Sequence, residues 1–137
     1  MSGVPAEIRL DATAAVPIVR VRGDIDIATV AGFRTGIGAA ADLGRGAVIV
    51  SLLETTYCDS LIVQALLALR ARLEAQGQRL LLVLGERGTP RRVLDIVGAT
   101  KRFPVFASVA AALLAAEAMV LEGRTDPRGD SPSRRDR

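Results

Sequence analysis

Hydrophobic and polar residues alternate in two segments near the start of the chain, at residues 7–10 and 18–22. Alternation with a period of two is typical of a strand that buries one face. Residues 47–50 and 80–84 are instead continuous apolar runs, which favour strands buried on both faces, as in a parallel sheet. Residues 103–106 predict a last, short edge strand, because an edge tolerates a proline.

Apolar residues recur at spacings of three and four between these strands, which is typical of helices packed on a core. The pattern predicts four helices, at residues 28–43, 60–76, 89–98 and 108–122. Small polar residues at their starts are candidate N-caps. We expect Asp59 or Ser60 to cap the second helix, Thr89 the third and Ser108 the fourth.

Helices and strands that alternate in this way predict an α/β fold with one domain. The sheet should be mixed but mostly parallel, with about four to five strands and about four helices packed on it, because only the first two strands follow each other without a helix. We place the domain at residues 6–121, after a flexible start at 1–5. Residues 122–137, rich in Arg, Asp and Pro, are expected to form a disordered tail.

The composition is that of a folded domain, since half of the 137 residues are hydrophobic. Eighteen basic residues stand against 15 acidic ones, with no basic stripe that carries aromatic residues, so we expect no nucleic-acid partner. Charges interrupt the apolar runs before the roughly 20 residues of a membrane span, so we expect no membrane insertion. No secretory signal pattern is present, and the single Cys58 fits a reducing cytoplasm.

The chain has no histidine, which excludes a Ser-His-Asp triad and a Cys-His pair. One cysteine without histidine also excludes an ordinary zinc site, and no phosphate-binding glycine motif occurs. We therefore expect no catalytic residue, no metal and no cofactor. A small α/β enzyme or nucleotide binder, with Asp26 and Asp59 on a metal ion, is the weakest of the alternatives.

A short polar group, residues 57–60, separates the third strand from the second helix. Thr55 and Thr56 are expected in a loop before that helix, and Cys58 is expected to be a small buried hydrophobe. At about 100° per residue, Ser60 points away from the core. A serine without a general base is a poor nucleophile but a good phosphoacceptor for another enzyme. The simpler interpretation is that the Asp-Ser pair only caps the helix.

The same helical projection gives the second helix a partly apolar outer face. Ser60, Gln64 and Leu67 lie on it, with Leu61 and Val63 at its edges. Such a face is suited to docking a partner.

Three motifs together resemble the STAS domain (sulfate transporter and anti-sigma factor antagonist) in its small, free-standing form. Residues 23–26, Gly-Asp-Ile-Asp, look like the family's Gly-Glu-Leu-Asp. Residues 58–60, Cys-Asp-Ser, after an apolar strand, look like the start of its Asp-Ser-Ser/Thr-Gly. Residues 76–84 look like the next helix-to-strand turn. The resemblance covers residues 6–121 and departs from the family motif at Leu61-Ile62, where Ser/Thr-Gly is usual.

The resemblance implies an anti-sigma factor antagonist, which binds an anti-sigma factor and thereby frees a sigma factor. The anti-sigma factor is often a serine kinase that phosphorylates the serine after the motif aspartate, and a phosphatase reverses this. By position, Ser60 is the phosphoacceptor, with Asp59 and Asp26 beside it. Leu61, Gln64 and Leu67 would complete the partner-binding surface of a monomer or weak dimer.

The alternative is a STAS subunit or scaffold that binds a transporter ATPase or a signalling assembly constitutively, without a working phosphoswitch. Leu61-Ile62 favours it slightly.

Overall fold

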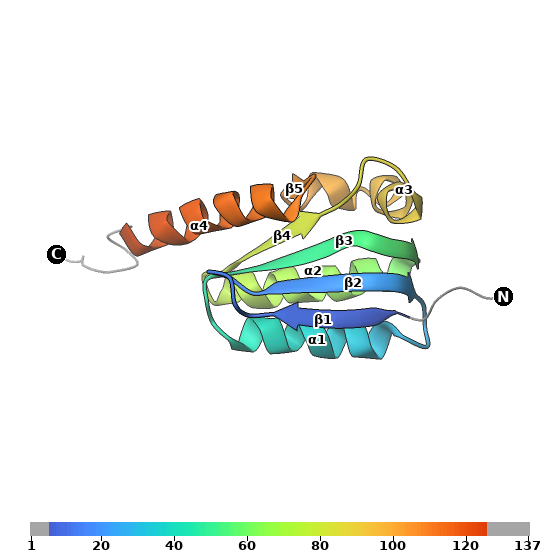
Figure 1. Cartoon of the computed structure of the whole chain (residues 1–137), viewed down its shortest axis with the longest axis horizontal. Coiled ribbons are helices and arrows are strands. Elements are labelled where there is room, and N and C mark those ends of the chain that lie inside the picture. Colours follow the sequence, from blue (N-terminus) through green and yellow to red (C-terminus); the bar gives the residue numbers. More distant parts are fainter. Residues whose placement is uncertain (1–5, 126–137) are drawn as a thin grey trace.

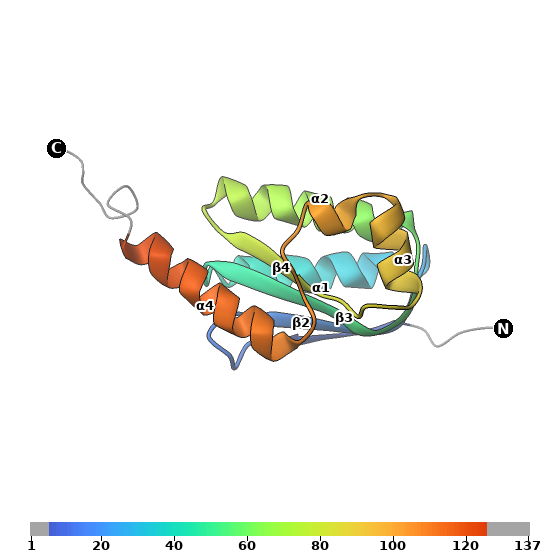
Figure 2. The same cartoon turned by 90° about the horizontal axis from the view of Figure 1, so that it is seen from above.

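The computed structural model describes residues 6–125, and this part forms a sheet covered by helices on both faces (Figures 1 and 2). The five strands are β1 (Glu7–Asp11), β2 (Ile18–Ile25), β3 (Ala47–Cys58), β4 (Arg79–Val83) and β5 (Val105–Phe106). The four helices are α1 (Val30–Asp42), α2 (Ser60–Ala75), α3 (Thr89–Ile96) and α4 (Val109–Thr125), with a 3₁₀ turn, η1 (Ala99–Lys101), after α3. The predicted α/β class and the approximate numbers of elements are confirmed.

The strands lie in the order β1-β2-β3-β4-β5, so each strand neighbours the next one along the chain (Figure 1). β1 is antiparallel to β2, and every later pair is parallel. The predicted mixed, mostly parallel sheet is therefore confirmed. Because β2, β3 and β4 run the same way, their carboxyl ends meet at one end of the sheet.

α1 and α2 cover one face of the sheet, and α4 covers part of the other (Figure 2). β3 contributes to both layers. Val48 and Val50 pack in the cluster under α1 and α2, whereas Ala47 and Ile49 pack in the cluster under α4. This explains the continuous apolar run in the sequence, since a strand between two helical layers has no solvent face.

The expected polar loop before α2 is absent, because β2 and β3 continue pairing to their last residues. The register pairs Gly23 with Thr55 after one shift and Ile25 with Cys58 after a second. Thr55 is buried, and its hydroxyl donates a 2.9 Å hydrogen bond to the carbonyl of Val21, while the Thr56 hydroxyl donates to Asp24. The prediction that Thr55 and Thr56 lie in a loop was wrong, because their hydroxyls bond across the strand pair.

The predicted ends of the later helices are only partly correct. Gly88, with φ of 101°, is the N-cap of α3, so the prediction of Thr89 as its cap was wrong. Glycine adopts this φ without the steric cost that a side chain would add. Ser108 does cap α4, since its Oγ accepts a 3.1 Å hydrogen bond from the amide of Ala111. α4 runs to Thr125, past its expected end at 122, and the other residues of the expected flexible ends, 1–5 and 126–137, lie outside the described residues.

The contact between Gly46 and α4 gives a test of the packing. Gly46 has φ of 92°, and a Cβ there would lie 2.8 Å from a methyl carbon of Val120. Gly46→Ala should therefore lower the free energy of unfolding by about 1–3 kcal/mol, measured by urea denaturation. Gly32→Ala is the control, because α1 has open space there, and it should stabilise the helix by about 1 kcal/mol. Equal stability of Gly46→Ala and the wild type would contradict the packing of α4 described above.

Candidate functional site

Two acidic residues follow the ends of two neighbouring parallel strands. Ile25 and Cys58, the last residues of β2 and β3, are paired, so Asp26 and Asp59 leave the sheet at the same end (Figure 1). The structure thus brings together the two acids that the sequence singled out. This end of the sheet also holds the N-termini of α1 and α2.

Asp59 is the cap of α2, and Ser60 is the first residue of the helix. The Asp59 side chain accepts a 2.9 Å hydrogen bond from the amide of Leu61, and the backbone of Asp59 is extended. Of the two capping residues considered from the sequence, Asp59 is therefore the right one. Ser60 is exposed and points away from the core. Within residues 6–125, no protein group forms a hydrogen bond with its hydroxyl.

Asp26 has a similar capping role before α1. Its Oδ1 accepts hydrogen bonds from the amides of Ala28 (3.0 Å) and Thr29 (3.2 Å). In return, the amide of Asp26 donates to the Thr29 hydroxyl at 2.9 Å. This reciprocal arrangement has the geometry of a capping box, but it lies in the turn before α1, whose N-cap is Thr29, and it fixes the path of the chain between β2 and α1. Both acids are thus held in place by backbone hydrogen bonds.

The outer face of α2 is mixed in character. Ser60 and Gln64 are exposed, and Leu61 and Leu67 are half-buried. Val63, expected at the edge of this face, is only 9% exposed, because it packs in the cluster under α1 and α2. These outward residues supply a hydroxyl, an amide and two partly accessible leucines to one surface.

The departure from the STAS motif at Leu61-Ile62 changes the surface at one residue only. Ile62 is 0% exposed and belongs to the main hydrophobic cluster, so it does not meet a partner. Leu61 is half-buried beside Ser60. The bulk next to the serine therefore comes from Leu61 alone.

Two exposed apolar residues at this end were missed in the sequence. Ile27, in the turn after β2, is 81% exposed, and Tyr57, near the tip of β3, is 44% exposed. Large exposed apolar side chains next to polar groups are a mark of interaction surfaces. The available signal was an isoleucine directly after Asp26, in a turn that connects a strand to a helix.

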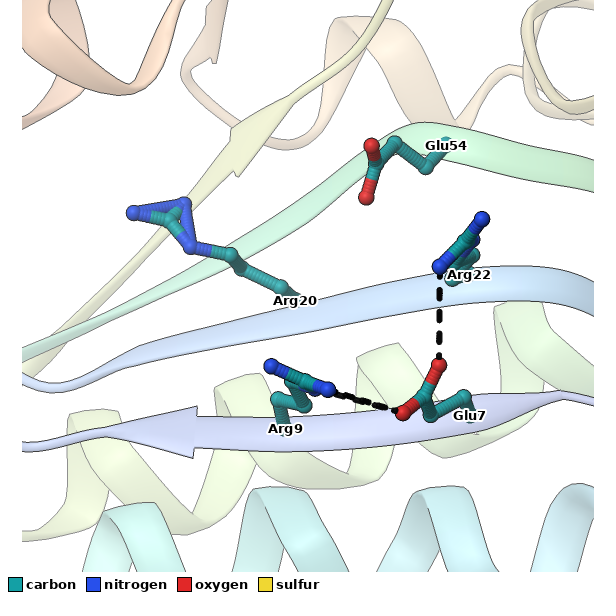
Figure 3. A pocket seen from close by; sticks show the side chains of 5 residues that line it. All are labelled: Glu7, Arg9, Arg20, Arg22 and Glu54. Carbon is teal, nitrogen blue, oxygen red and sulfur yellow. Dashed lines mark hydrogen bonds and ion pairs between the residues drawn. The ribbon is translucent and has the colours of Figure 1, made fainter.

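Five charged residues surround a shallow hollow on the uncovered face of β1, β2 and β3, shown in Figure 3: Glu7, Arg9, Arg20, Arg22 and Glu54. Glu7 pairs with Arg9 at 3.2 Å and, loosely, with Arg22 at 3.9 Å, while Arg20 pairs with Asp11 at 3.9 Å. Three arginines thus face three acids when Asp11 is included. The hollow has no excess charge with which to select an ion, and exposed pairs of this kind contribute little to stability.

No group of three or more acidic, cysteine or histidine side chains in residues 6–125 is placed to hold a metal ion. Within the same range, no helix is both long and apolar enough to cross a membrane.

Cys58 is confirmed as a buried residue, with 1% of its surface exposed. Burial, and secondarily the charge of Asp59, raise the pKa of the thiol to about 11. The thiolate is the reactive form, so the folded protein presents an inert cysteine.

The thiol should accordingly resist modification in the folded protein. At pH 8, dithionitrobenzoate should label Cys58 of the folded chain about a hundredfold more slowly than a small free thiol. In guanidinium, which unfolds the chain, labelling should go to completion. The pKa of the thiol is raised above its ordinary 9.0. Its contribution to the free energy of unfolding should therefore be constant below pH 9 and fall as the pH rises toward 11. Rapid labelling of the folded chain would contradict the burial of Cys58.

The cap of α2 can be tested separately. Asp59→Ala removes the acceptor for the Leu61 amide and should lower the free energy of unfolding by about 1 kcal/mol. Asp59→Asn keeps a side-chain acceptor, so it should lower the free energy of unfolding by only a few tenths of the loss in Asp59→Ala. Thermal or urea unfolding measures both, and equal losses in the two variants would show that the charge of Asp59, not its hydrogen bond, stabilises the helix.

Comparison with known proteins gives a consistent family. The model of the STAS domain matches residues 7–112. An anti-sigma factor antagonist from Mycobacterium paratuberculosis has 24% sequence identity and a TM-score of 0.74, over 82% of this chain and 94% of that one. The comparison with curated proteins found no significant match.

SpoIIAA, an anti-sigma factor antagonist, is similar in two solved forms. Its unphosphorylated form has 22% identity and a TM-score of 0.67, over 82% of this chain and 97% of that one. The phosphorylated form of the Bacillus protein has 23% identity and a TM-score of 0.61, over 80% of this chain and 98% of that one. These likenesses concern the fold. Since the family model covers most of the sequence, the chain belongs to the STAS domain family.

Proposed function

We propose that this chain is an anti-sigma factor antagonist, a regulator without enzymatic activity that binds an anti-sigma factor in the cytoplasm and so releases a sigma factor. The observation that carries the proposal is the exposed Ser60, directly after Asp59 and at the same end of the sheet as Asp26. The solved relatives that bear this name have the same fold, and one of them is known in both phosphorylation states.

The surface around Ser60 has the composition of a protein-binding site. Ile27 and Tyr57 offer apolar area, and Leu61 is partly accessible. Asp26 and Asp59 add negative charge to that area, which suits a partner with basic side chains. Protein–protein interfaces usually have apolar contacts at the centre and charged groups at the rim.

Phosphorylation of Ser60 would act on this surface and leave the fold intact. A phosphate adds a charge of about −1.5 to −2 at neutral pH. The N-terminus of α2 tolerates the charge, because the helix dipole is positive there. Asp59 repels it, and a partner that docks on the apolar residues would have to bury it. The phosphate would therefore weaken binding, with the serine kinase activity of the anti-sigma factor as its source and a phosphatase as the means of removal.

A second candidate is a STAS subunit or scaffold that binds a transporter ATPase or a signalling assembly constitutively. Leu61 favours it, because a half-buried leucine beside Ser60 narrows the approach of a kinase to the hydroxyl. In that case the surface would be the same, and only the switch would be absent.

Charge at Ser60 distinguishes the two candidates. We expect Ser60→Ala to bind the organism's anti-sigma factor within about threefold of the wild type, and Ser60→Asp to bind at least tenfold more weakly, a loss of about 1.4 kcal/mol, in isothermal titration calorimetry. Ala110→Asp is the matched control, since it places the same charge on an exposed residue in the first turn of α4. It should bind like the wild type.

Equal binding of all variants to a confirmed partner would reject the switch and support the scaffold. Incubation of the wild-type chain with the anti-sigma factor and ATP, followed by mass spectrometry, should place one phosphate on Ser60 and none on Ser60→Ala.

A further inference from the structure

Two aliphatic side chains are exposed side by side at the end of α3. Ile96 is 77% exposed and Val97 is 45% exposed. Single exposed aliphatic residues are common on protein surfaces, but adjacent ones at the end of a short helix form a small apolar patch. α3 lies at the same end of the molecule as the tip of β3 in both views (Figures 1 and 2).

The fold prevents these two residues from turning inward. α3 directs Pro90 and Leu94 into the protein, and both are buried. After Val97 the chain reverses at Gly98, whose φ is 78°, and then buries Ala99. The interior next to α3 is therefore filled by other residues, and Ile96 and Val97 stay on the outside.

The patch is also held firmly. The Thr100 hydroxyl donates a 2.8 Å hydrogen bond to Asp95, which ties η1 to the last turn of α3. Arg91 donates to the other oxygen of Asp95 at 3.3 Å. Asp95 is thus engaged by two neighbours, and Arg91 balances its charge.

Three cations lie close to the aliphatic pair in sequence. Arg92, Lys101 and Arg102 are exposed, and within residues 6–125 none of them forms an ion pair with an acid. Arg92 lies one helical turn before Ile96, on the same side of α3. We call these five residues, Arg92, Ile96, Val97, Lys101 and Arg102, the α3 patch. It is positive and apolar, whereas the surface that carries Asp26 and Asp59, at the same end of the molecule, is negative.

We propose that the α3 patch binds an acidic segment of a protein partner, one that carries aliphatic side chains among its aspartates or glutamates. The negative charge of such a segment complements the three unpaired cations of the α3 patch. Its aliphatic side chains would cover Ile96 and Val97. Binding would be steered by charge and weakened by salt. The proposal does not depend on Ser60 or on its phosphorylation.

Two other classes of ligand fit the patch less well. An interfacial helix needs a long apolar face, but α3 has eight residues and exposes two aliphatic ones. Single-stranded nucleic acid is bound by aromatic side chains that stack on bases, and Phe103, the aromatic residue closest in sequence, is buried.

A site-specific photo-crosslink tests the proposal. The photoreactive residue p-benzoyl-phenylalanine would replace Ile96 in the full chain, which is irradiated in lysate of the source cells, and the crosslinked peptide is sequenced by mass spectrometry. The control carries the same residue at Leu114, which is 71% exposed on α4. We expect the position 96 adduct to be a protein segment with net negative charge and aliphatic residues, in at least tenfold excess over its yield from position 114.

Charge reversal supplies the second arm. R92E, K101E and R102E combined should reduce the position 96 adduct at least tenfold, while circular dichroism and thermal unfolding show an intact fold. Ser60→Asp should leave the adduct unchanged.

Any of four results would overturn the proposal: a yield no higher than at position 114, a lipid or nucleic-acid adduct, a basic peptide, or an adduct that survives charge reversal. Loss of the adduct in Ser60→Asp would show that the α3 patch acts only as part of the Ser60 surface. The binding test at Ser60 can fail without changing these outcomes, so the two proposals are separable.

Discussion

The pairing of β2 with β3 is the contact on which the rest of this structure depends. β3 is buried between two helical layers, so its backbone groups must find partners within the sheet. β2 supplies them along one side until both strands end, at Ile25 and Cys58. This pairing places Asp26 and Asp59 together, and it starts α1 and α2 from the same end of the sheet.

The positions of the acids then follow from helix chemistry. Each helix begins with amides that have no partner inside the helix, and a carboxylate next to the strand end accepts hydrogen bonds from them. Asp59 does this for the Leu61 amide, and Asp26 does it for the turn before α1. The same residues that stabilise the helix starts also give this surface its charge. If the proposed partner docks here, a substitution at either acid would change both the helix start and the binding surface.

Much of the fold could be predicted from the sequence, because hydrophobic period and capping chemistry are local. The two-sided burial of residues 47–50, the exposure of Ser60 and the cap at Ser108 are of this kind. The length of β3 could not be predicted, because its polar tip pairs only with the distant β2. The exposure of Ile27, Tyr57 and Ile96 was also missed, since it depends on which residues of other elements fill the interior. A hydrophobic residue in a sequence does not reveal that its place in the core is already occupied.

The direct passage from β3 to α2 has a thermodynamic consequence. A single residue, Asp59, connects the end of β3 at Cys58 to the start of α2 at Ser60. Its side chain is hydrogen-bonded to the helix. A binding surface built on a loop loses conformational entropy when a partner orders it, and that loss reduces the affinity. Here the backbone at Ser60 is already ordered in the free chain. A partner of the proposed Ser60 surface would therefore lose little affinity to the ordering of this segment.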